Sequence, residues 1–83
     1  MTPRVTLYGR AGCHLCDEAR EAILALRAEE VSLELHEVDI EADERLHAEL
    51  MERVPVVEVE GSIVSELVLD VQALRSRLHT VAA

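Results

Sequence analysis

The sequence predicts an α/β fold in which a four-stranded mixed sheet is flanked by helices, with the element order β-α-β-α-β-β-α. Three observations carry this prediction. A short alternating run at 4–8 is followed by a long segment with helical spacing at 14–29. Two later β-type runs meet at Glu60-Gly61, which is a hairpin signal, and the chain then ends in helical spacing. We expect a single domain over 1–83, because a chain this short has room for one modest core.

The first strand and the first helix have the clearest pattern. In the run RVTLY, Val5 and Leu7 alternate with polar residues, and Gly9 and Gly12 then mark a loop. From 14 to 29 the spacing becomes helical, with charged residues on the opposite face. The apolar positions of this predicted helix are Leu15, Ala19, Ala22, Ile23 and Leu26.

The second β-type run, at 31–40, changes its pattern half-way. Leu33 and Leu35 fall on one parity, whereas Val38 and Ile40 fall on the other. This break predicts an edge strand with a bulge, or a strand that ends near His36. The following segment, 41–53, repeats apolar residues at helical spacing and predicts a short second helix.

The last third of the chain predicts two strands and a helix. The run at 56–67 reads as two strands joined at Gly61, whose lack of a side chain suits a positive φ. Asp70 is a suitable N-cap for a final helix that carries Val71, Leu74 and Leu78. A strand, a helix and a strand in succession form a parallel, right-handed unit, to which the hairpin adds antiparallel strands.

Composition and charge exclude several classes of partner. Seventeen acidic residues against eight basic ones give a formal net charge of −9. A field of this sign repels phosphate backbones and anionic lipids. Tyr8 is the single aromatic residue, so base stacking has little to work with. We therefore expect neither nucleic acid nor a membrane as a partner.

The cellular compartment follows from what the sequence lacks. The N-terminal stretch MTPRVTLYGR does not resemble a signal peptide, and no apolar run approaches the roughly 20 residues that cross a bilayer. We expect a cytoplasmic protein. A permanent structural disulfide is uncommon in that reducing compartment, so two close cysteines point to catalysis or metal binding.

Cys13 and Cys16, the two cysteines of the chain, lie three residues apart at the start of the first predicted helix. With Cys13 at the N-cap and Cys16 inside the first turn, the two sulfurs can approach closely enough to bond. The free N–H groups and the positive dipole end of the helix stabilise a thiolate at the N-cap. This predicts Cys13 as the nucleophile and Cys16 as the thiol that resolves a mixed disulfide. Arg10 and a protonated His14 would favour the thiolate further.

Three other interpretations of the cysteine pair remain open at this point. A structural zinc site normally needs four ligands, and the four histidines of this chain are dispersed. Two inert, buried cysteines are compatible with the apolar character of the side chain. A Cu(I)-binding module also uses a Cys-x-x-Cys loop after a first strand, but its usual order, β-α-β-β-α-β, differs from the order predicted here.

The combination of a β-strand, CHLC, a β-α-β half and VPVVEVEG resembles the glutaredoxin and thioredoxin-like superfamily, and it looks most like its small bacterial glutaredoxin-like proteins. The resemblance covers 4–80 and implies a thioredoxin-like fold. It implies Cys13 as the attacking thiol and Cys16 as the resolving thiol. It also implies that Pro55 is preceded by a cis peptide bond and lies against the cysteines.

The resemblance also implies a set of substrate-binding residues. The backbone of Val54 would hydrogen-bond an extended substrate, next to Pro55. Arg10 stands where glutaredoxins carry a basic residue that meets a carboxylate of glutathione. His14 and Leu15 occupy the two positions between the cysteines, where the family typically has proline and an aromatic residue.

Ser65 and Glu66 depart from the family pattern, because they stand where glutaredoxins have a Gly-Gly pair that helps to grip glutathione. Their side chains are expected to obstruct that groove and to add negative charge to it. The resemblance implies glutathione or another low-molecular-weight thiol as the reductant, and this departure argues against glutathione.

Together these observations predict a thiol–disulfide oxidoreductase that uses the redox-active disulfide Cys13–Cys16, with no bound cofactor and no metal. The expected partners are a protein or small-molecule disulfide and a reductase, and the expected oligomeric state is a monomer. The alternative from another class is a thiol module that binds Cu(I) or a shared iron–sulfur cluster. A redox-sensing adaptor is the third hypothesis.

Overall fold

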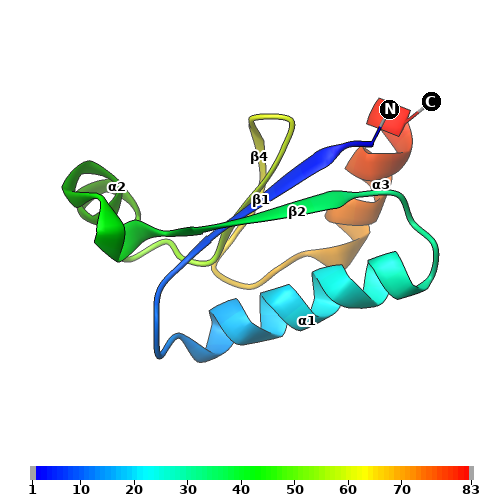
Figure 1. The fold of residues 1–83 in the computed structure, drawn as a ribbon. Coiled ribbons are helices and arrows are strands. Elements are labelled where there is room, and N and C mark those ends of the chain that lie inside the picture. Colours follow the sequence, from blue (N-terminus) through cyan, green and yellow to red (C-terminus); the bar gives the residue numbers. More distant parts are fainter. Residues whose placement is uncertain (1, 83) are drawn as a thin grey trace.

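Four strands form one mixed sheet in the computed structural model, which describes residues 2–82 (Figure 1). In chain order the strands are β1 (Arg4–Gly9), β2 (Glu34–Asp39), β3 (Val56–Val59) and β4 (Ser62–Glu66). Their order across the sheet is β2-β1-β3-β4. β1 pairs in parallel with β2 and antiparallel with β3, and β3 pairs antiparallel with β4. The mixed four-stranded sheet predicted from the sequence is confirmed.

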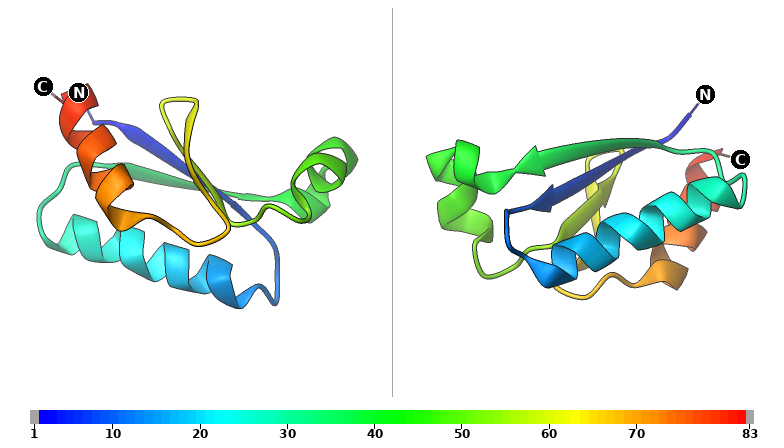
Figure 2. Two further views of the ribbon diagram at one scale, coloured as in Figure 1. Left: turned by 180° about the vertical axis from the view of Figure 1, so that it is seen from behind. Right: turned by 60° about the horizontal axis from the view of Figure 1, so that its bottom comes forward.

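Helices cover the two faces of this sheet unequally. α1 (His14–Ala28) and α3 (Val71–Ala82) lie together on one face, whereas α2 (Glu44–Leu50) lies at one end of the sheet, beyond β2 (Figure 2). A short 3₁₀ helix, η1 (Ile40–Ala42), joins β2 to α2. In residues 2–82, no helix has the length and apolar character needed to cross a membrane.

The buried apolar residues form two clusters. The larger cluster lies between the sheet and the pair α1 and α3, and it explains why one parity of β1 is apolar. Its buried members are Val5, Leu7, Ala19, Ile23, Leu26, Leu33, Val57, Val59, Leu74 and Leu78. The smaller cluster lies at the end of the sheet near the cysteines and draws its residues from the start of α1, η1, α2 and the segment that leads into β3. Its buried members are Cys13, Cys16, Ile40, Leu50, Val54 and Val56. The two cysteines thus belong to the smaller core.

The predicted elements 31–40 and 41–53 are the ones that the structure corrects. β2 does lie at an edge of the sheet, but its register with β1 continues without a break from Arg4↔Glu34 to Gly9↔Asp39, so the expected bulge is absent there. The irregularity lies instead between Val57 and Glu58 in the β3–β4 pair. The strand also does not end near His36. The alternation of apolar residues along 31–40 changes because the two ends of this run pack in different clusters. Leu35 packs against the larger cluster, whereas Ile40 lies beyond the end of β2 and belongs to the smaller cluster.

The hairpin and the last helix agree with the sequence. Both residues of the β3–β4 turn have positive φ, 49° at Glu60 and 84° at Gly61, as a tight two-residue hairpin requires. The Asp70 side chain accepts a hydrogen bond from Ala73 N–H at 3.0 Å, and therefore caps α3. The second helix is shorter than 41–53, because Asp43 caps it from outside and its first residues form η1.

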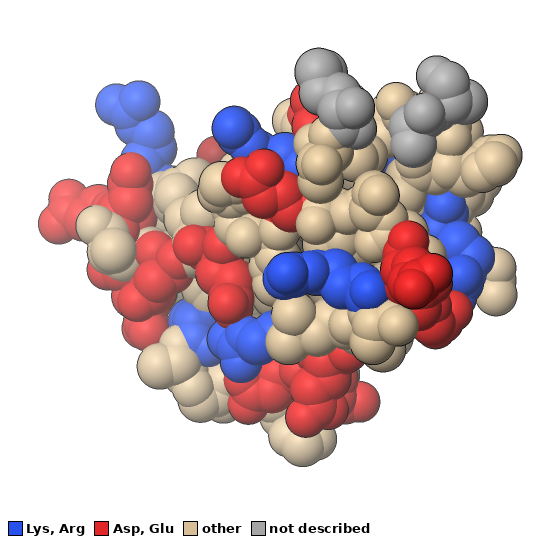
Figure 3. All heavy atoms as spheres, turned by 45° about the vertical axis from the view of Figure 1, so that its right-hand side comes forward, with Lys and Arg blue, Asp and Glu red and all other residues tan. Residues whose placement is uncertain are grey.

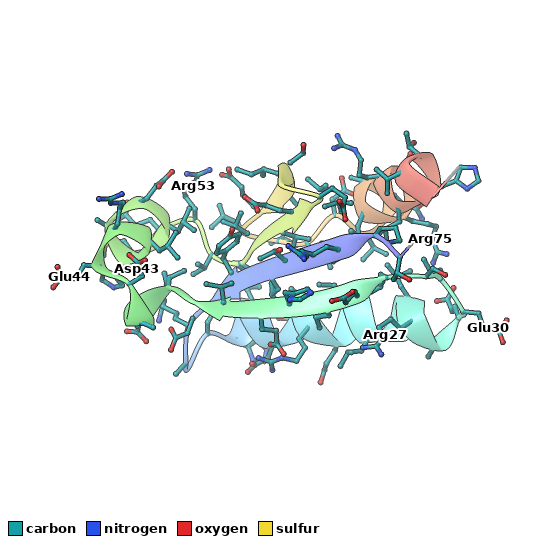
Figure 4. The ribbon with its side chains drawn as sticks, turned by 45° about the horizontal axis from the view of Figure 1, so that its top comes forward. Arg27, Glu30, Asp43, Glu44, Arg53 and Arg75 are labelled. Carbon is teal, nitrogen blue, oxygen red and sulfur yellow. A yellow bond between two sulfur atoms is a disulfide. The ribbon has the colours of Figure 1, made fainter. Side chains whose placement is uncertain are left out.

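Acidic side chains are spread over the molecule, with arginines between them (Figure 3). Several arginines are held in ion pairs, such as Arg75 with Glu29 at 3.2 Å. Asp43 and Glu44 lie at the α2 end of the molecule, whereas Arg75 lies at the opposite end (Figure 4). The start of α2 thus carries the carboxylates of Asp43 and Glu44, next to Arg45.

Candidate active site

Cys13 and Cys16 are joined by a disulfide at the start of α1, with their Cα atoms 5.2 Å apart. Cys13 is the N-cap residue of α1, with extended backbone angles of −91° and 107°. Its Sγ accepts a hydrogen bond from Cys16 N–H at 3.1 Å. An N–H group that already points at a sulfur stabilises that sulfur as a thiolate. The geometry therefore distinguishes Cys13 as the sulfur that the helix end can activate.

The loop before the cysteines turns the chain sharply from β1 into α1. Gly12 has a φ of +75°, in the left-handed region where glycine carries no steric penalty. Cys13 N–H donates to the Arg10 carbonyl at 3.4 Å, which closes this turn. Gly9 ends β1 next to Cys16, and any Cβ at Gly9 would lie 3.2 Å from Cys16 Sγ. The absence of a side chain at Gly9 is thus what lets Cys16 pack on the strand.

Both cysteines are largely buried, Cys13 with 8% of its surface exposed and Cys16 with 4%. Val54, the residue before Pro55, belongs to the same cluster as the two cysteines. The expected contact of Pro55 itself with the cysteines stays a prediction. Cys13 is slightly more exposed than Cys16.

A cavity of about 380 Å³ opens beside Cys16, between the start of α1 and the end of β2. Its lining residues are Leu7, Gly9, Arg10, Ala11, Cys16, Asp17, Arg20, Glu37, Val38 and Asp39. Arg20 crosses it, with its Nε 2.6 Å from Glu37 Oε1 and one terminal nitrogen 3.4 Å from Asp17 Oδ1. This ion pairing raises the pKa of Arg20, chiefly through the hydrogen bond to Glu37. Charged and apolar residues together line the cavity.

The peptide bond between Val54 and Pro55 is cis, as the family resemblance implied. Pro55 is buried, and its carbonyl accepts a hydrogen bond from Leu67 N–H at 2.9 Å. Val54 N–H donates to the Leu50 carbonyl at 3.1 Å. That N–H is therefore engaged within the chain.

The two residues between the cysteines point in different directions. The His14 side chain is 89% exposed, and its Nε2 lies 3.4 Å from Glu18 Oε2, one turn along α1. It therefore leans along the helix surface toward an acid. Leu15 is 40% exposed and lines a shallow pocket together with residues of the segment after β4. Arg10 lines the cavity beside Cys16.

The expectation that Ser65 and Glu66 would obstruct a groove and add free negative charge is wrong in its detail. Ser65 turns inward, where its hydroxyl donates to the Val68 carbonyl at 3.1 Å and accepts from Asp70 N–H at 3.0 Å. The Glu66 carboxylate is paired with Arg53, and the hydrogen bond from Arg53 lowers the pKa of Glu66. The positive charge of Arg53 thus balances the negative charge of Glu66.

Within residues 2–82, no three or more side chains of His, Cys, Asp and Glu come together as a group that could hold a metal ion. The two cysteine sulfurs are the metal-type ligands at this site, and in this structure they are bonded to each other.

Comparisons with known proteins agree with this geometry. A family model described as "Glutaredoxin-like domain (DUF836)" matches residues 4–79. The chain belongs to this glutaredoxin-like family. The curated proteins that were searched include no match to the chain.

Solved structures place this glutaredoxin-like chain in the thioredoxin fold. Protein Ne2328 from Nitrosomonas europaea is 28% identical, with 93% of this chain and 92% of that chain covered and a TM-score of 0.81. Protein XcR50 from X. campestris is 34% identical, with coverage of 92% and 96% and a TM-score of 0.74. Oxidised thioredoxin from Plasmodium falciparum is 18% identical, with coverage of 98% and 82% and a TM-score of 0.63. At that identity the likeness to thioredoxin shows the fold.

The sequence marked Gly9 only as a loop residue and Ser65 only as a departure from the family pattern, and the structural role of each was missed. Gly9 makes room for Cys16, and its position at the end of a strand is a signal for close approach. Ser65 closes the loop after β4 with two hydrogen bonds. The sequence does carry a signal for this role of Ser65: a serine stands among apolar residues, and the helix cap Asp70 follows five residues later.

Proposed function

We propose that this protein is a thiol–disulfide oxidoreductase that reduces disulfides in proteins or small molecules with the Cys13–Cys16 pair. The observation that carries this proposal is the hydrogen bond from Cys16 N–H to Cys13 Sγ at the N-cap of α1. It supports Cys13 as the sulfur that the helix N-terminus stabilises as a thiolate, and the thiolate is the nucleophile in thiol–disulfide exchange.

The reaction starts from the reduced protein. The Cys13 thiolate attacks one sulfur of the substrate disulfide, the substrate S–S bond breaks, and the departing sulfur takes up a proton. Cys16 then loses its proton to water in the cavity beside it and attacks Cys13 Sγ. The second substrate thiol leaves, and the Cys13–Cys16 disulfide forms. Two electrons pass from the protein to the substrate.

A reductant must return two electrons and one proton to the protein, which restores Cys13 as a thiolate and Cys16 as a thiol. A low-molecular-weight thiol or a dithiol reductase supplies them by the reverse exchange at Cys13. In this scheme the Val54 carbonyl binds the backbone of the extended substrate beside Pro55, and Arg10 attracts a carboxylate of a thiol substrate. The protein works as a cytoplasmic monomer without a bound cofactor.

The reduction potential of the cysteine pair tests the proposal first. The protein is equilibrated in defined thiol/disulfide buffers, and the oxidised fraction is measured by alkylation and mass spectrometry. A reversible two-electron transition between about −300 and −120 mV is expected, the range of this class. A pair that stays reduced throughout this range would remove the basis of the proposal.

The order of the two cysteines is tested by trapping. Cys16→Ser should accumulate a mixed disulfide at Cys13 when it is mixed with a disulfide substrate, because nothing can resolve it. Cys13→Ser is the matched control and should form much less adduct, since Cys16 is more deeply buried. Thiolate-to-metal absorption bands after anaerobic purification would instead favour the metal-binding hypothesis.

A further inference from the structure

A cavity of about 580 Å³ lies between α3 and the turn that joins α1 to β2. Its walls come from these two elements: Val31 and Ser32 from the turn, and Gln72, Arg75, Leu78 and His79 from α3. It is larger than the cavity of about 380 Å³ beside Cys16. Sites for small molecules are typically hollows of about 300–1,000 Å³. The cavity therefore has room for a small organic ligand.

The cavity lies at the end of the molecule opposite the cysteines (Figure 1). Cys13 and Cys16 stand at the first turn of α1, whereas Val31 and Ser32 follow its last turn. A helix of 15 residues is about 22 Å long, at a rise of about 1.5 Å per residue. Among the described lining residues, the two cavities share none. A small ligand bound here therefore stays clear of the reacting sulfurs.

The turn that forms one wall is fixed by backbone hydrogen bonds. Glu30 N–H donates to the Arg27 carbonyl at 2.9 Å, and Val31 N–H donates to the Leu26 carbonyl at 3.0 Å. These two bonds form a Schellman motif, which sets the path of the chain where it leaves the helix. Glu30 has a φ of 69°, in the left-handed region that glycine usually occupies in this motif. This wall thus exists before a ligand arrives, which lowers the entropy that binding costs.

Arg75 holds the second wall to the first (Figure 4). Its Nη2 donates to Glu29 Oε1 at 3.2 Å, which ties α3 to the C-terminal end of α1. A guanidinium carries five N–H donors, and within residues 2–82 this hydrogen bond is the one that the Arg75 side chain makes. The side chain is 43% exposed. Most of its donors are therefore available to a ligand, and their planar arrangement suits the two oxygens of a carboxylate.

Two apolar residues line the cavity beside this arginine. Leu78 is buried in the larger cluster, and Val31 packs against the same cluster. Because both residues also line the cavity, it opens onto the edge of the hydrophobic core. Apolar atoms of a ligand that covered them would be removed from water, which favours binding.

The described lining residues include no acidic side chain, although acids outnumber bases by seventeen to eight in the whole chain. The cavity beside Cys16 differs, since Asp17, Glu37 and Asp39 line it. Exposed charges more than about 8 Å apart are largely screened at physiological salt. Arg75 and its near neighbours therefore decide which ligand is accepted. Glu29 balances part of the charge of Arg75, so the attraction for an anion comes mainly from directed hydrogen bonds.

We propose that this cavity is a binding site for a small carboxylic acid with an aliphatic body. The carboxylate accepts hydrogen bonds from the available donors of Arg75, and the aliphatic body lies over Val31 and Leu78. Gln72 and Ser32, both exposed, add neutral hydrogen-bonding groups at the rim. The site is independent of the thiol–disulfide exchange, because its ligand touches neither cysteine.

The test measures how four probes bind to the wild-type protein: octanoate, acetate, octanol and octylammonium. Each is titrated into isotopically labelled protein at neutral pH and physiological salt, and amide NMR spectra report both the affinity and the place of binding. Octanoate should bind saturably and shift the amides of residues 31–32 and 72–79. Acetate lacks the aliphatic body and octanol lacks the charge, so each should bind at least about tenfold more weakly. Octylammonium has the wrong charge for Arg75 and should also bind at least about tenfold more weakly.

Matched variants assign the affinity to the cavity. Arg75→Gln removes the guanidinium and should weaken octanoate binding about tenfold or more, with octanol binding little changed. Gln72→Glu places a carboxylate in the lining and should also weaken octanoate binding. Arg77→Gln is the control, since it removes the same charge from the same helix at a residue that does not line the cavity. It should keep the wild-type affinity, and thermal melts check that all three variants fold.

Glu29→Gln separates a ligand-binding role of Arg75 from a purely structural one. It breaks the ion pair that ties α3 to α1 but leaves the guanidinium in place. If Arg75 only held the two walls together, Glu29→Gln would weaken octanoate binding as much as Arg75→Gln does, and the assignment of Arg75 would be wrong. We expect an affinity equal to or above that of the wild type, because one more donor becomes available and a nearby negative charge is removed.

Three further outcomes would overturn the proposal. Octanoate could bind elsewhere or not at all, or octanol could bind as tightly as octanoate, which would leave the carboxylate without a role. An equal loss of affinity in Arg77→Gln and Arg75→Gln would attribute binding to overall charge instead of the cavity. None of these results touches the proposed oxidoreductase, whose reduction potential is measured without the probes. A failure of that measurement likewise leaves the carboxylate site standing.

Discussion

Gly9 lies directly against Cys16: a Cβ atom at Gly9 would stand 3.2 Å from both Cβ and Sγ of this cysteine. The contact joins the last residue of β1 to the first turn of α1, and so sets how far the resolving sulfur sits from the sheet. Both atoms belong to a buried side chain in the smaller core, where little space is free to absorb an added methyl group.

Gly9→Ala should therefore displace Cys16 and lower the free energy of unfolding by about 1–3 kcal/mol, the usual cost of overpacking. It should also slow the step in which Cys16 attacks the mixed disulfide. Urea unfolding and single-turnover reduction of a disulfide measure the two effects. Gly61→Ala is the control, because Gly61 has a φ of +84° and open space around it. It should cost about 1–2 kcal/mol through left-handed strain, with unchanged cysteine kinetics. Equal kinetics in both variants would contradict this prediction.

Ser65→Ala should lower the free energy of unfolding by about 1–3 kcal/mol, because it removes two partly buried hydrogen bonds and leaves Asp70 N–H and the Val68 carbonyl without that partner. Chemical denaturation measures the loss, and amide hydrogen exchange should show faster opening at residues 67–70. Ser62→Ala, at an exposed position of the same strand, is the control and should change stability by less than about 0.5 kcal/mol. Unaltered exchange in Ser65→Ala would count against a closing role for this hydroxyl.

Tyr8 should titrate above the ordinary tyrosine pKa of 10.0. Burial is the largest cause that raises the pKa of Tyr8, and the hydrogen bond to Glu58 and the negative charge of Glu58 raise this pKa further. Since Tyr8 is the single tyrosine, tyrosinate absorbance reports on it alone. The folded protein keeps this proton where the unfolded chain has lost it. The stabilisation is therefore complete below the unfolded pKa and is lost as the pH rises through the folded one.

Glu58→Gln provides the control for this titration. It removes the negative charge but not the burial, so the pKa of Tyr8 should fall part of the way toward 10.0. A pKa that does not move in Glu58→Gln would show that the carboxylate has no influence on the phenol.

Ile23→Ala should lower the free energy of unfolding by about 2–5 kcal/mol, because Ile23 is fully buried in the larger cluster and the truncation leaves a cavity. Leu24→Ala, at the next residue of α1, removes side-chain atoms from a position that is 42% exposed. It should cost less than about 1 kcal/mol. The midpoints of urea unfolding compare the stabilities of the two variants. Similar losses of stability would mean that a different face of α1 packs against the core.

Local patterns in the sequence were sufficient for most of the elements. The helical spacing over 14–29 predicts α1, the Glu60-Gly61 pair predicts the hairpin, and Asp70 predicts the cap of α3. Each of these signals acts over a few residues along the chain. The placement of Cys13 at an N-cap follows from the same kind of local rule, which is why the candidate site could be located.

Contacts between distant residues could not be predicted in this way. Tyr8 bonds Glu58 across the sheet, and Arg53 pairs with Glu66, although fifty and thirteen positions separate the partners. The inward turn of Ser65 depends on the loop conformation that Leu67 adopts at a φ of 65°. The sequence also failed to predict that β2 is continuous. Its apolar residues change sides because they pack in two separate clusters, and not because the strand has a bulge.

β2 forms one outer edge of the sheet, and its exposed backbone could pair with a strand of another molecule. Four of its six residues are acidic or histidine, in the run ELHEVD. Charged side chains along a sheet edge discourage that pairing, because a second copy would bring like charges together. The edge strand is thus protected against aggregation by its own sequence. Acidification through the carboxylate range would remove this protection, so concentrated solutions of the protein should stay clear near neutral pH and form sheet-rich aggregates in acid.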